Sequence, residues 1–438
     1  MTIANDTIQT LLDQDGPFAN RNDAPSSSSF SKEARLMAAA LAKQKQQTKY
    51  RVIRNQIFDL LDVHSFAEIQ NLIHDPKKRK AVTKRTYALL GNMFGVEGNC
   101  EEIIAAIHSY SRTADAVIRH LRGKVLNNFS SHIEMTNEID VIVNPIDLLL
   151  IIFDPRYHKK ARFEAKRKLY LMNLAGAIDQ RERETDIETK FALFLNFLNM
   201  HVWTKDSKIG ELELVNVLSS HRKSDFSCEK IEFLSHKEAS SVTPNPGQKL
   251  TLLKRRRFTW GNRDIPIYVS IRKKQSEAKV LKLLRKGEEN PAVAVDDELG
   301  LIGVLDNIAD VKAFQEHLTN SAKEADSLMV LEDISDSLIS GNRSKSNIGS
   351  SKQTRMLKFF ARIGGMRVEF IVHTNESYLN YIYQRDVAHD EYEVRRIFDS
   401  GVAAQLFPEE IYFLPLNMAR KYQLNWFRRQ LESHLGRI

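Results

Sequence analysis

With 438 residues, the chain is too long for one ordinary hydrophobic core, and we expect two domains. Its 42% hydrophobic and 27% charged residues are ordinary for a globular protein, and its longest apolar run, Leu148 to Phe153, is far too short to span a bilayer. Lysine and arginine exceed aspartate and glutamate by 64 − 56 = +8, which favours polyanions such as nucleotides or RNA as partners and equally fits a role in solubility alone.

The N-terminus and the cysteines exclude further classes. Residues Met1 to Asp15 carry acids and amides where a secretory signal would be apolar, so we predict a cytoplasmic protein with no membrane partner. Cys100 and Cys228 are the only cysteines. Two cysteines this far apart provide neither a disulfide framework nor a cysteine-based zinc site.

Residues 1–48 are predicted to be disordered or loosely ordered, because they combine Gly, Pro and a serine run with few large apolar residues. From 49 to 225, apolar residues recur at helical spacing and predict an α-helical domain. Asn144-Pro145 is typical of a helix start. We interpret His74-Asp75, the only His-Asp pair in this region, as a helix end rather than a metal site. The domain is left without assigned chemistry, and a regulatory or protein-binding role stays open.

Residues 226–438 change to short β-branched segments mixed with helices, which predicts an α/β domain built on a mixed sheet. The fold class is therefore α+β. The expected strands are 230–234, 249–253, 265–271, 293–295, 299–305, 328–331, 356–363 and 367–374. The expected helices are 276–286, 311–318, 378–383 and 426–438, and a mobile loop is expected over 335–351. Lys254 to Arg257, near Trp260, fits a solvated hairpin tip or, alternatively, an RNA contact.

Three pieces of this domain carry candidate chemistry. Arg272-Lys273-Lys274 follows a strand and precedes a helix that bears Lys279 and Lys282, and such a group of cations can hold a polyphosphate. Asp296-Asp297-Glu298-Leu299-Gly300 places carboxylates at the start of a strand, where Mg²⁺ can bind. The last piece is Glu369, which lies inside an apolar strand where a carboxylate is costly unless it is paired or bound to metal. Each piece alone has a bland explanation as a solvated charge.

Together, their order and spacing resemble the synthetase domain of the RelA/SpoT alarmone enzymes, over about residues 265–400. This family has a nucleotidyltransferase-type fold and transfers pyrophosphate from ATP to GDP or GTP in guanosine tetraphosphate metabolism. Its motifs are Arg-x-Lys at a strand end, a helix lysine, Asp-x-x-Gly-x-Arg, a tyrosine-bearing loop and Glu-x-Gln-x-Arg-Thr. Matching positions here are Arg272, Lys274, Lys282, Asp297, Gly300, Arg355, Glu369 and Thr374.

The resemblance implies roles for these residues. Arg272, Lys274 and Lys282 would hold the ATP phosphates, with Arg355 also binding the nucleotide. Asp297 and Glu369 would be the catalytic residues and the Mg²⁺ ligands, and Glu369 would alternatively deprotonate the attacking hydroxyl. The acceptor would be a nucleotide or RNA.

Several positions depart from the family pattern. Ile302 replaces the arginine of the acidic motif, Ile371 and His373 replace the glutamine and arginine of the last motif, and Thr354 stands where the family has tyrosine. The phosphate side of the site is therefore partly kept, whereas the acceptor side is altered. Two hypotheses remain: a pyrophosphokinase or nucleotidyltransferase with a different acceptor, and a degenerate nucleotide- or RNA-binding regulatory module.

Overall fold

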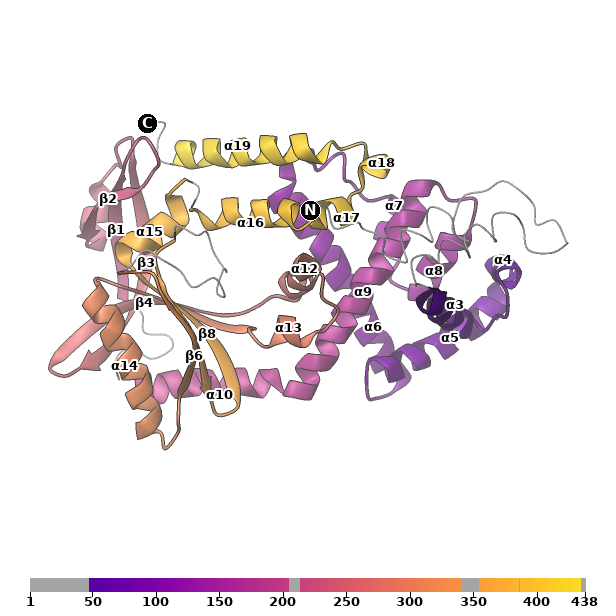
Figure 1. The fold of residues 1–438 in the computed structure, drawn as a ribbon, viewed down its shortest axis with the longest axis horizontal. Coiled ribbons are helices and arrows are strands. Elements are labelled where there is room, and N and C mark those ends of the chain that lie inside the picture. Colours follow the sequence, from indigo (N-terminus) through magenta and orange to yellow (C-terminus); the bar gives the residue numbers. More distant parts are fainter. Residues whose placement is uncertain (1–46, 205–212, 340–353, 386, 435–438) are drawn as a thin grey trace. The chain divides into compact units, whose positions relative to one another are not determined.

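The computed structural model describes residues 47–204, 213–339, 354–385 and 387–434 (Figure 1). The predicted N-terminal segment 1–48 lies almost wholly outside these ranges, and so do residues 340–351 of the predicted loop 335–351. Ser335 and Asp336, also predicted to be in that loop, belong instead to a strand. The chain divides into two compact units. The first comprises residues up to 119, 131–180 and 410–412, and the second comprises 120–130, 181–409 and 413–438. The fold is α+β, as predicted.

Nowhere in the described ranges is there a helix with the length and apolar character needed to cross a membrane.

The first unit is built from helices. These are α3 (Gln47–Leu61), α4 (Phe66–His74), α5 (Pro76–Met93), α6 (Cys100–His120), α7 (Asn137–Asp140), α8 (Pro145–Phe153), most of α9 (Lys159–Thr185) and most of α18 (Glu409–Tyr412). Asp75 accepts hydrogen bonds from the backbone N–H groups of Lys77 and Lys78, which confirms that His74-Asp75 is a helix junction. Asn144 caps α8 in the same way.

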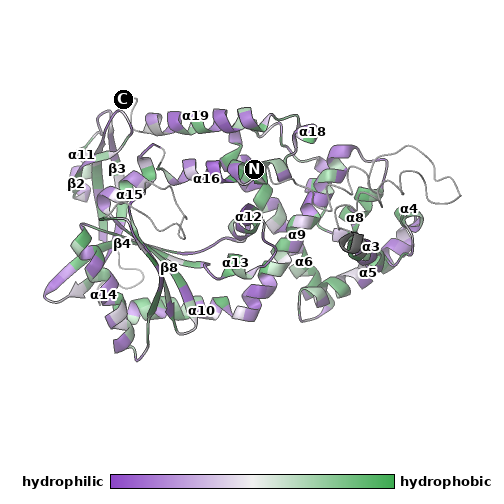
Figure 2. Ribbon diagram, viewed as in Figure 1, coloured by the Kyte–Doolittle hydropathy of each residue, from purple (hydrophilic) through white to green (hydrophobic). Residues whose placement is uncertain are grey.

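Helix α8 is apolar on nearly every side (Figure 2), and all of its residues except Asp147 are buried. Its buried side chains include Leu148, which is fully enclosed. The unit also contains a buried ion pair, in which Lys168 Nζ lies 2.9 Å from Asp115 Oδ1. Burial raises the pKa of Asp115 even though Lys168 opposes the rise.

The second unit is built on one eight-stranded sheet. The strands are β1 (Glu213–His221), β2 (Cys228–Leu234), β3 (Gln248–Trp260), β4 (Arg263–Lys273), β5 (Leu299–Leu305), β6 (Val330–Asp336), β7 (Leu357–Ile363) and β8 (Met366–Thr374). Their order is β2-β1-β3-β4-β5-β8-β7-β6. Every neighbouring pair is antiparallel except β5 and β8, which run parallel, so the sheet is mixed.

The helices of the second unit precede, interrupt and follow the sheet. They are η1 (Leu121–Val125), η2 (Asn127–Phe129), α10 (Ile187–Phe197), η3 (Leu198–Val202), α11 (His236–Ser241), α12 (Ser276–Lys286), α13 (Ala292–Val295), α14 (Ile308–Glu324), α15 (Asn375–Tyr383), α16 (His389–Asp399), α17 (Val402–Leu406) and α19 (Leu416–His434). The bounds of α12 and β5 agree with the prediction, and so does the hairpin of β7 and β8. Its two-residue turn, Gly364-Gly365, needs the positive φ of +54° and +76° that glycine adopts readily.

The structure corrects three of the sequence predictions. Strand β1 lies within the segment predicted to be helical up to 225, because pairing with both β2 and β3 decides its conformation. Residues 293–295, predicted as a strand, belong to α13, whose first turn closes when the Val295 N–H donates to the carbonyl of Pro291. Arg255 and Arg256 lie buried inside the long strand β3 and are not at a solvated hairpin tip. Arg255 instead lies over the ring of Phe233, at 4.1 Å.

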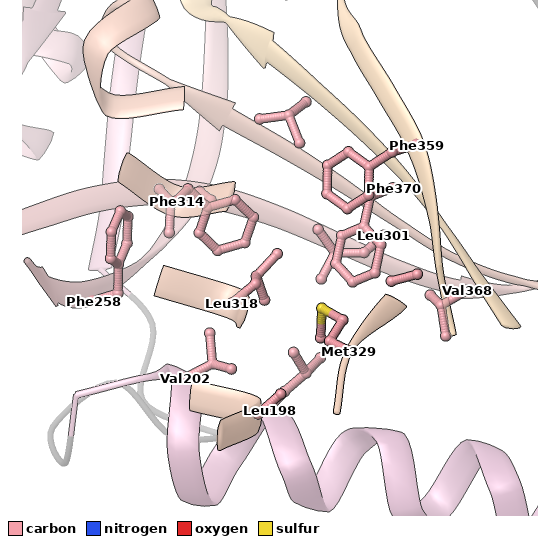
Figure 3. Packing of buried hydrophobic residues seen from close by; sticks show 14 of the residues in the cluster. Leu198, Val202, Phe258, Leu301, Phe314, Leu318, Met329, Phe359, Val368 and Phe370 are labelled. Carbon is pink, nitrogen blue, oxygen red and sulfur yellow. The ribbon is translucent and has the colours of Figure 1, made fainter. Parts of the chain in front are cut away.

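Alternating side chains give the centre of the sheet two different faces. One face packs into the main hydrophobic core, with Leu301 of β5, Val368 and Phe370 of β8, and Phe359 of β7 (Figure 3). The rings of Phe359 and Phe370 stack with centroids 5.0 Å apart. Helices α10 and α14 cover this face (Figure 1). Burial of each such side chain contributes about 1.5–3 kcal/mol.

The opposite side of β4, β5, β8 and β7 is called the polar face here. Its side chains alternate with the core residues and include Ser270, Arg272, Ile302, Lys358, Glu369, Ile371 and His373. Helix α15 packs on this side, where the hydroxyl groups of Tyr378 and Tyr268 lie 3.5 Å apart. Core packing on one side thus fixes which side chains are presented on the other.

Candidate polyphosphate site

A row of paired residues across three strands brings Arg272 and Glu369 together. Arg272 of β4 is the backbone partner of Gly300 in β5, and Gly300 is the partner of Glu369 in β8. The Arg272 guanidinium donates through Nη2 to Glu369 Oε2, at 3.1 Å. Gly300 makes room for this contact, since a Cβ at that position would lie 3.2 Å from Arg272 Nε.

A lysine from the neighbouring strand completes the pairing of Glu369. Lys358 of β7 places its Nζ 2.7 Å from the second carboxylate oxygen, Oε1. Each oxygen of Glu369 therefore has one cationic partner. This explains how a carboxylate is tolerated inside an apolar strand.

Asp297 has a similar pair of partners. It lies two residues before β5 and contacts a lysine that follows β4 and a lysine of α12. Lys274 Nζ is 2.7 Å from Asp297 Oδ2, and Lys282 Nζ is 2.6 Å from Oδ1. Arg272, Lys274, Lys282 and Lys358, together with Asp297 and Glu369, are called the cation cluster below. Four cations against two carboxylates leave a net charge of +2.

Lys274 connects the two halves of the cluster, because its charge acts on both carboxylates. Burial opposes ionisation of Asp297, but Lys274 and Lys282 outweigh it, and the pKa of Asp297 lies below its ordinary value. Burial likewise opposes ionisation of Glu369, and Lys358 and Lys274 outweigh it, so its pKa is also lowered. Both carboxylates are thus charged at neutral pH and are weak bases while these partners remain.

The neighbouring residue Glu298 belongs to a different group of charges. It is fully buried, and its Oε1 lies 2.8 Å from Nζ of the buried Lys279. Lys279 also pairs with Glu182, and Lys273 pairs with Glu188 while lying 3.7 Å from Glu298. These five residues are called the buried ion-pair network. Although Lys279 and Lys282 were expected to act together, the fold directs them to adjacent carboxylates in separate groups.

Five of the six predicted site residues therefore lie together, and the sixth does not. Within the described ranges, the side chain of Arg355 makes no ion pair with the cluster and is exposed. Only its carbonyl contributes a contact, accepting a hydrogen bond from His373 Nδ1 at 3.1 Å. Thr354, beside it, is buried.

Positions that differ from the RelA/SpoT pattern also lie on the polar face. Ile302 and Ile371 are backbone partners in β5 and β8, two residues further along their strands than Gly300 and Glu369. Their side chains therefore lie side by side on the polar face, next to the cation cluster, where the family pattern has arginine and glutamine. Both of these neighbouring positions are apolar in this chain.

Two side chains at the site were missed from the sequence. Lys358 could have been found: the two-residue turn fixes the hairpin register, which pairs Lys358 with Ile371 and places its amine diagonally beside Glu369. Tyr381 of α15 is the second. It lies close enough to Arg272 and Glu369 for their charges to act on its hydroxyl, and only the packing of α15 reveals this.

The donor set of the cluster can be tested for Mg²⁺. In the part of the chain that the structure describes, no three side chains of histidine, cysteine, aspartate or glutamate gather as a metal site would require. Mg²⁺ commonly takes one or two protein carboxylates and completes its shell with water and substrate phosphates. Asp297 and Glu369 carry carboxylate oxygens, the type of ligand that Mg²⁺ takes, and both are engaged by cations in this structure.

The chain was also compared with known proteins. No protein-family model matches it, and neither the curated proteins nor the solved structures provided a match.

Proposed function

We propose that the cation cluster binds the polyphosphate of a nucleotide, and that the second unit transfers pyrophosphate or a nucleotidyl group from ATP to a nucleotide or RNA. The observation that carries this proposal is the surplus of two positive charges around Asp297 and Glu369. The cations come from the end of β4 and the residue after it, from α12 and from β7, so they can surround a polyphosphate chain. Arg272, whose side chain is 40% exposed, is the most accessible of them.

Phosphate oxygens would compete with the two carboxylates for the same cations. Guanidinium and ammonium groups form strong charge-assisted hydrogen bonds with phosphate. When Arg272 and Lys274 turn towards a polyphosphate, Asp297 and Glu369 lose partners and become available as Mg²⁺ ligands. The bound metal would supply charge neutralisation at the phosphates.

In the proposed transfer, a hydroxyl oxygen of the acceptor attacks the β-phosphorus of ATP. The bond from that phosphorus to the oxygen bridging to the α-phosphate breaks, AMP leaves, and pyrophosphate is joined to the acceptor. The hydroxyl proton must pass to a base. Glu369 can take it only after Arg272 and Lys358 have turned away, because these cations keep its proton affinity low. The cations offset the charge that develops on the phosphates.

A second candidate is a binding module of the same fold without turnover. The adjacent Ile302 and Ile371 favour it, because they remove two polar groups from the surface beside Glu369. Such a module would bind a nucleotide or RNA through the same cations. Both candidates therefore predict polyphosphate binding, and they differ in whether product forms.

The test is product formation from ATP labelled at the γ-phosphate, with Mg²⁺, using GDP, GTP, ATP or bulk transfer RNA as acceptors. We expect AMP release and a labelled acceptor with the wild type, and neither with Glu369→Ala. The matched control is Glu332→Ala, since Glu332 is an ion-paired glutamate of β6 outside the cluster and its loss should leave turnover unchanged.

Release of pyrophosphate instead of AMP would indicate nucleotidyl transfer. Binding of ATP without turnover with any acceptor would favour the module. Absence of both binding and turnover would refute the proposed site.

A further inference from the structure

The surface beside the cation cluster is apolar and aromatic, which is unusual for a site that binds phosphate alone. Ile302 and Ile371 lie one row from Gly300 and Glu369, and each is only partly buried. Inorganic polyphosphate has no uncharged part that would gain from such a surface. An amphipathic anion, which joins phosphates to an uncharged ring, would gain from both surfaces.

Tyr381 of α15 adds an aromatic ring at the same place. Its ring centroid lies 5.3 Å from the ring of His373, which follows Ile371 on the polar face of β8. Burial raises the pKa of its hydroxyl, on which the charges of Arg272, Glu393, Asp390 and Glu369 also act. Ile371 and His373 are alternate residues of β8 on the polar face, so the ring of Tyr381 lies against the position next to Ile371.

The ring is positioned from two sides and is still partly exposed. The centroids of Tyr381 and His389 are 5.4 Å apart, so the Tyr381 ring lies near imidazoles from both β8 and α16. A tyrosine that only filled the core would need no place beside an arginine that is 40% exposed. An aromatic face next to a phosphate-binding cation is the arrangement that allows a base to stack while its phosphates are held.

We propose that the natural ligand of the cation cluster is a nucleoside polyphosphate whose base lies against Tyr381, Ile302 and Ile371. This proposal rests on the proposed function, because it assumes that the cluster holds the phosphates. It goes further by assigning the base-binding surface to α15 and to the paired isoleucines.

Titration calorimetry of the full chain without metal tests this, using ATP and inorganic tripolyphosphate as probes. We expect the wild type to bind ATP about tenfold more tightly than tripolyphosphate, at the lower end of what stacking of one base provides. Tyr381→Leu should remove this difference by weakening ATP alone. Tyr381→Phe, which keeps the ring, should bind both probes like the wild type.

The matched control is Tyr422→Leu on α19, an exposed tyrosine that packs on Phe129, and it should change neither affinity. Equal binding of ATP and tripolyphosphate by the wild type, or an unchanged ATP affinity in Tyr381→Leu, would overturn the base-binding surface while the phosphate site stands. No binding of either probe would overturn both proposals.

Discussion

Asp297 and Glu298 are adjacent in the sequence, yet they belong to groups of charges with different properties. The cation cluster around Asp297 has two positive charges in excess and includes the half-exposed Arg272. The buried ion-pair network around Glu298 has three carboxylates against two lysines, and its central pair is enclosed. The pKa of Asp297 is lowered, whereas burial raises the pKa of Glu298. The excess of cations at a partly open position is typical of a binding site, and the enclosed pair is typical of a structural role.

The largest expected effect is on stability. Lys279→Ala should lower the free energy of unfolding by about 3–5 kcal/mol, because it leaves the buried Glu298 without its closest partner. Urea denaturation measures this. Lys286→Ala, at the exposed end of the same helix, is the control and should change stability by no more than about 0.5 kcal/mol. If both variants were equally stable, the structural role of the network would be wrong.

In the cation cluster, loss of a carboxylate should strengthen phosphate binding, and the expected change in free energy is smaller. Glu369→Gln should bind metal-free tripolyphosphate about tenfold more tightly than the wild type, a gain of roughly 1.4 kcal/mol, because the carboxylate no longer competes for Arg272 and Lys358. Titration calorimetry measures the affinity, with Glu332→Gln as the control. Weaker binding by Glu369→Gln would contradict competition between carboxylate and phosphate.

Gly300 lies between Arg272 and Glu369 in the row of paired residues, and its replacement should have a moderate effect on phosphate binding. The added methyl of Gly300→Ala would press on Arg272 Nε, and the flexible arginine would move away from its position over the strand. We expect tripolyphosphate affinity to fall about threefold, roughly 0.7 kcal/mol or the net value of one hydrogen bond, with little loss of stability. Gly123→Ala, whose methyl would meet no atom within 4 Å, is the control. An unchanged affinity would show that the position of Arg272 does not matter.

The smallest effects concern pH, where the two glutamates should differ in sign. The folded-state pKa of Glu369 lies below the ordinary 4.5, so its contribution to stability is present above pH 4.5 and is lost as the pH falls through the folded pKa. The folded-state pKa of Glu298 lies above 4.5, so its contribution is present below pH 4.5 and is lost as the pH rises through the folded value.

Thermal unfolding from pH 3 to 7 can separate these contributions. Below pH 4.5, Glu369→Gln should lose less stability on acidification than the wild type. Above pH 4.5, Glu298→Gln should lose less stability as the pH rises. Parallel curves for the wild type and both variants would contradict the opposite pKa shifts.

A local sequence pattern predicted an element correctly where all the residues that decide the element lie within one segment. Ser276–Lys286 ends at Gly287, which adopts a positive φ, and the Gly364-Gly365 turn fixes its own hairpin. Strand β1 was missed because its conformation depends on pairing with β2 and β3, which lie outside its own segment. The same reasoning applies to the site: alternation predicted that Glu369 needed a partner, but the packing of α12 decided that Lys282 meets Asp297 while Lys279 meets Glu298.

The parallel pairing of β5 with β8 has a consequence for the time at which the site forms. Between the two strands the chain must complete α14, β6 and β7, and Glu369 meets Arg272 across 97 residues of sequence. During synthesis, Asp297 and Lys274 are present long before Lys358 and Glu369 emerge. The cation cluster is therefore incomplete in a partly synthesised chain and is assembled late, when β8 enters the centre of the sheet.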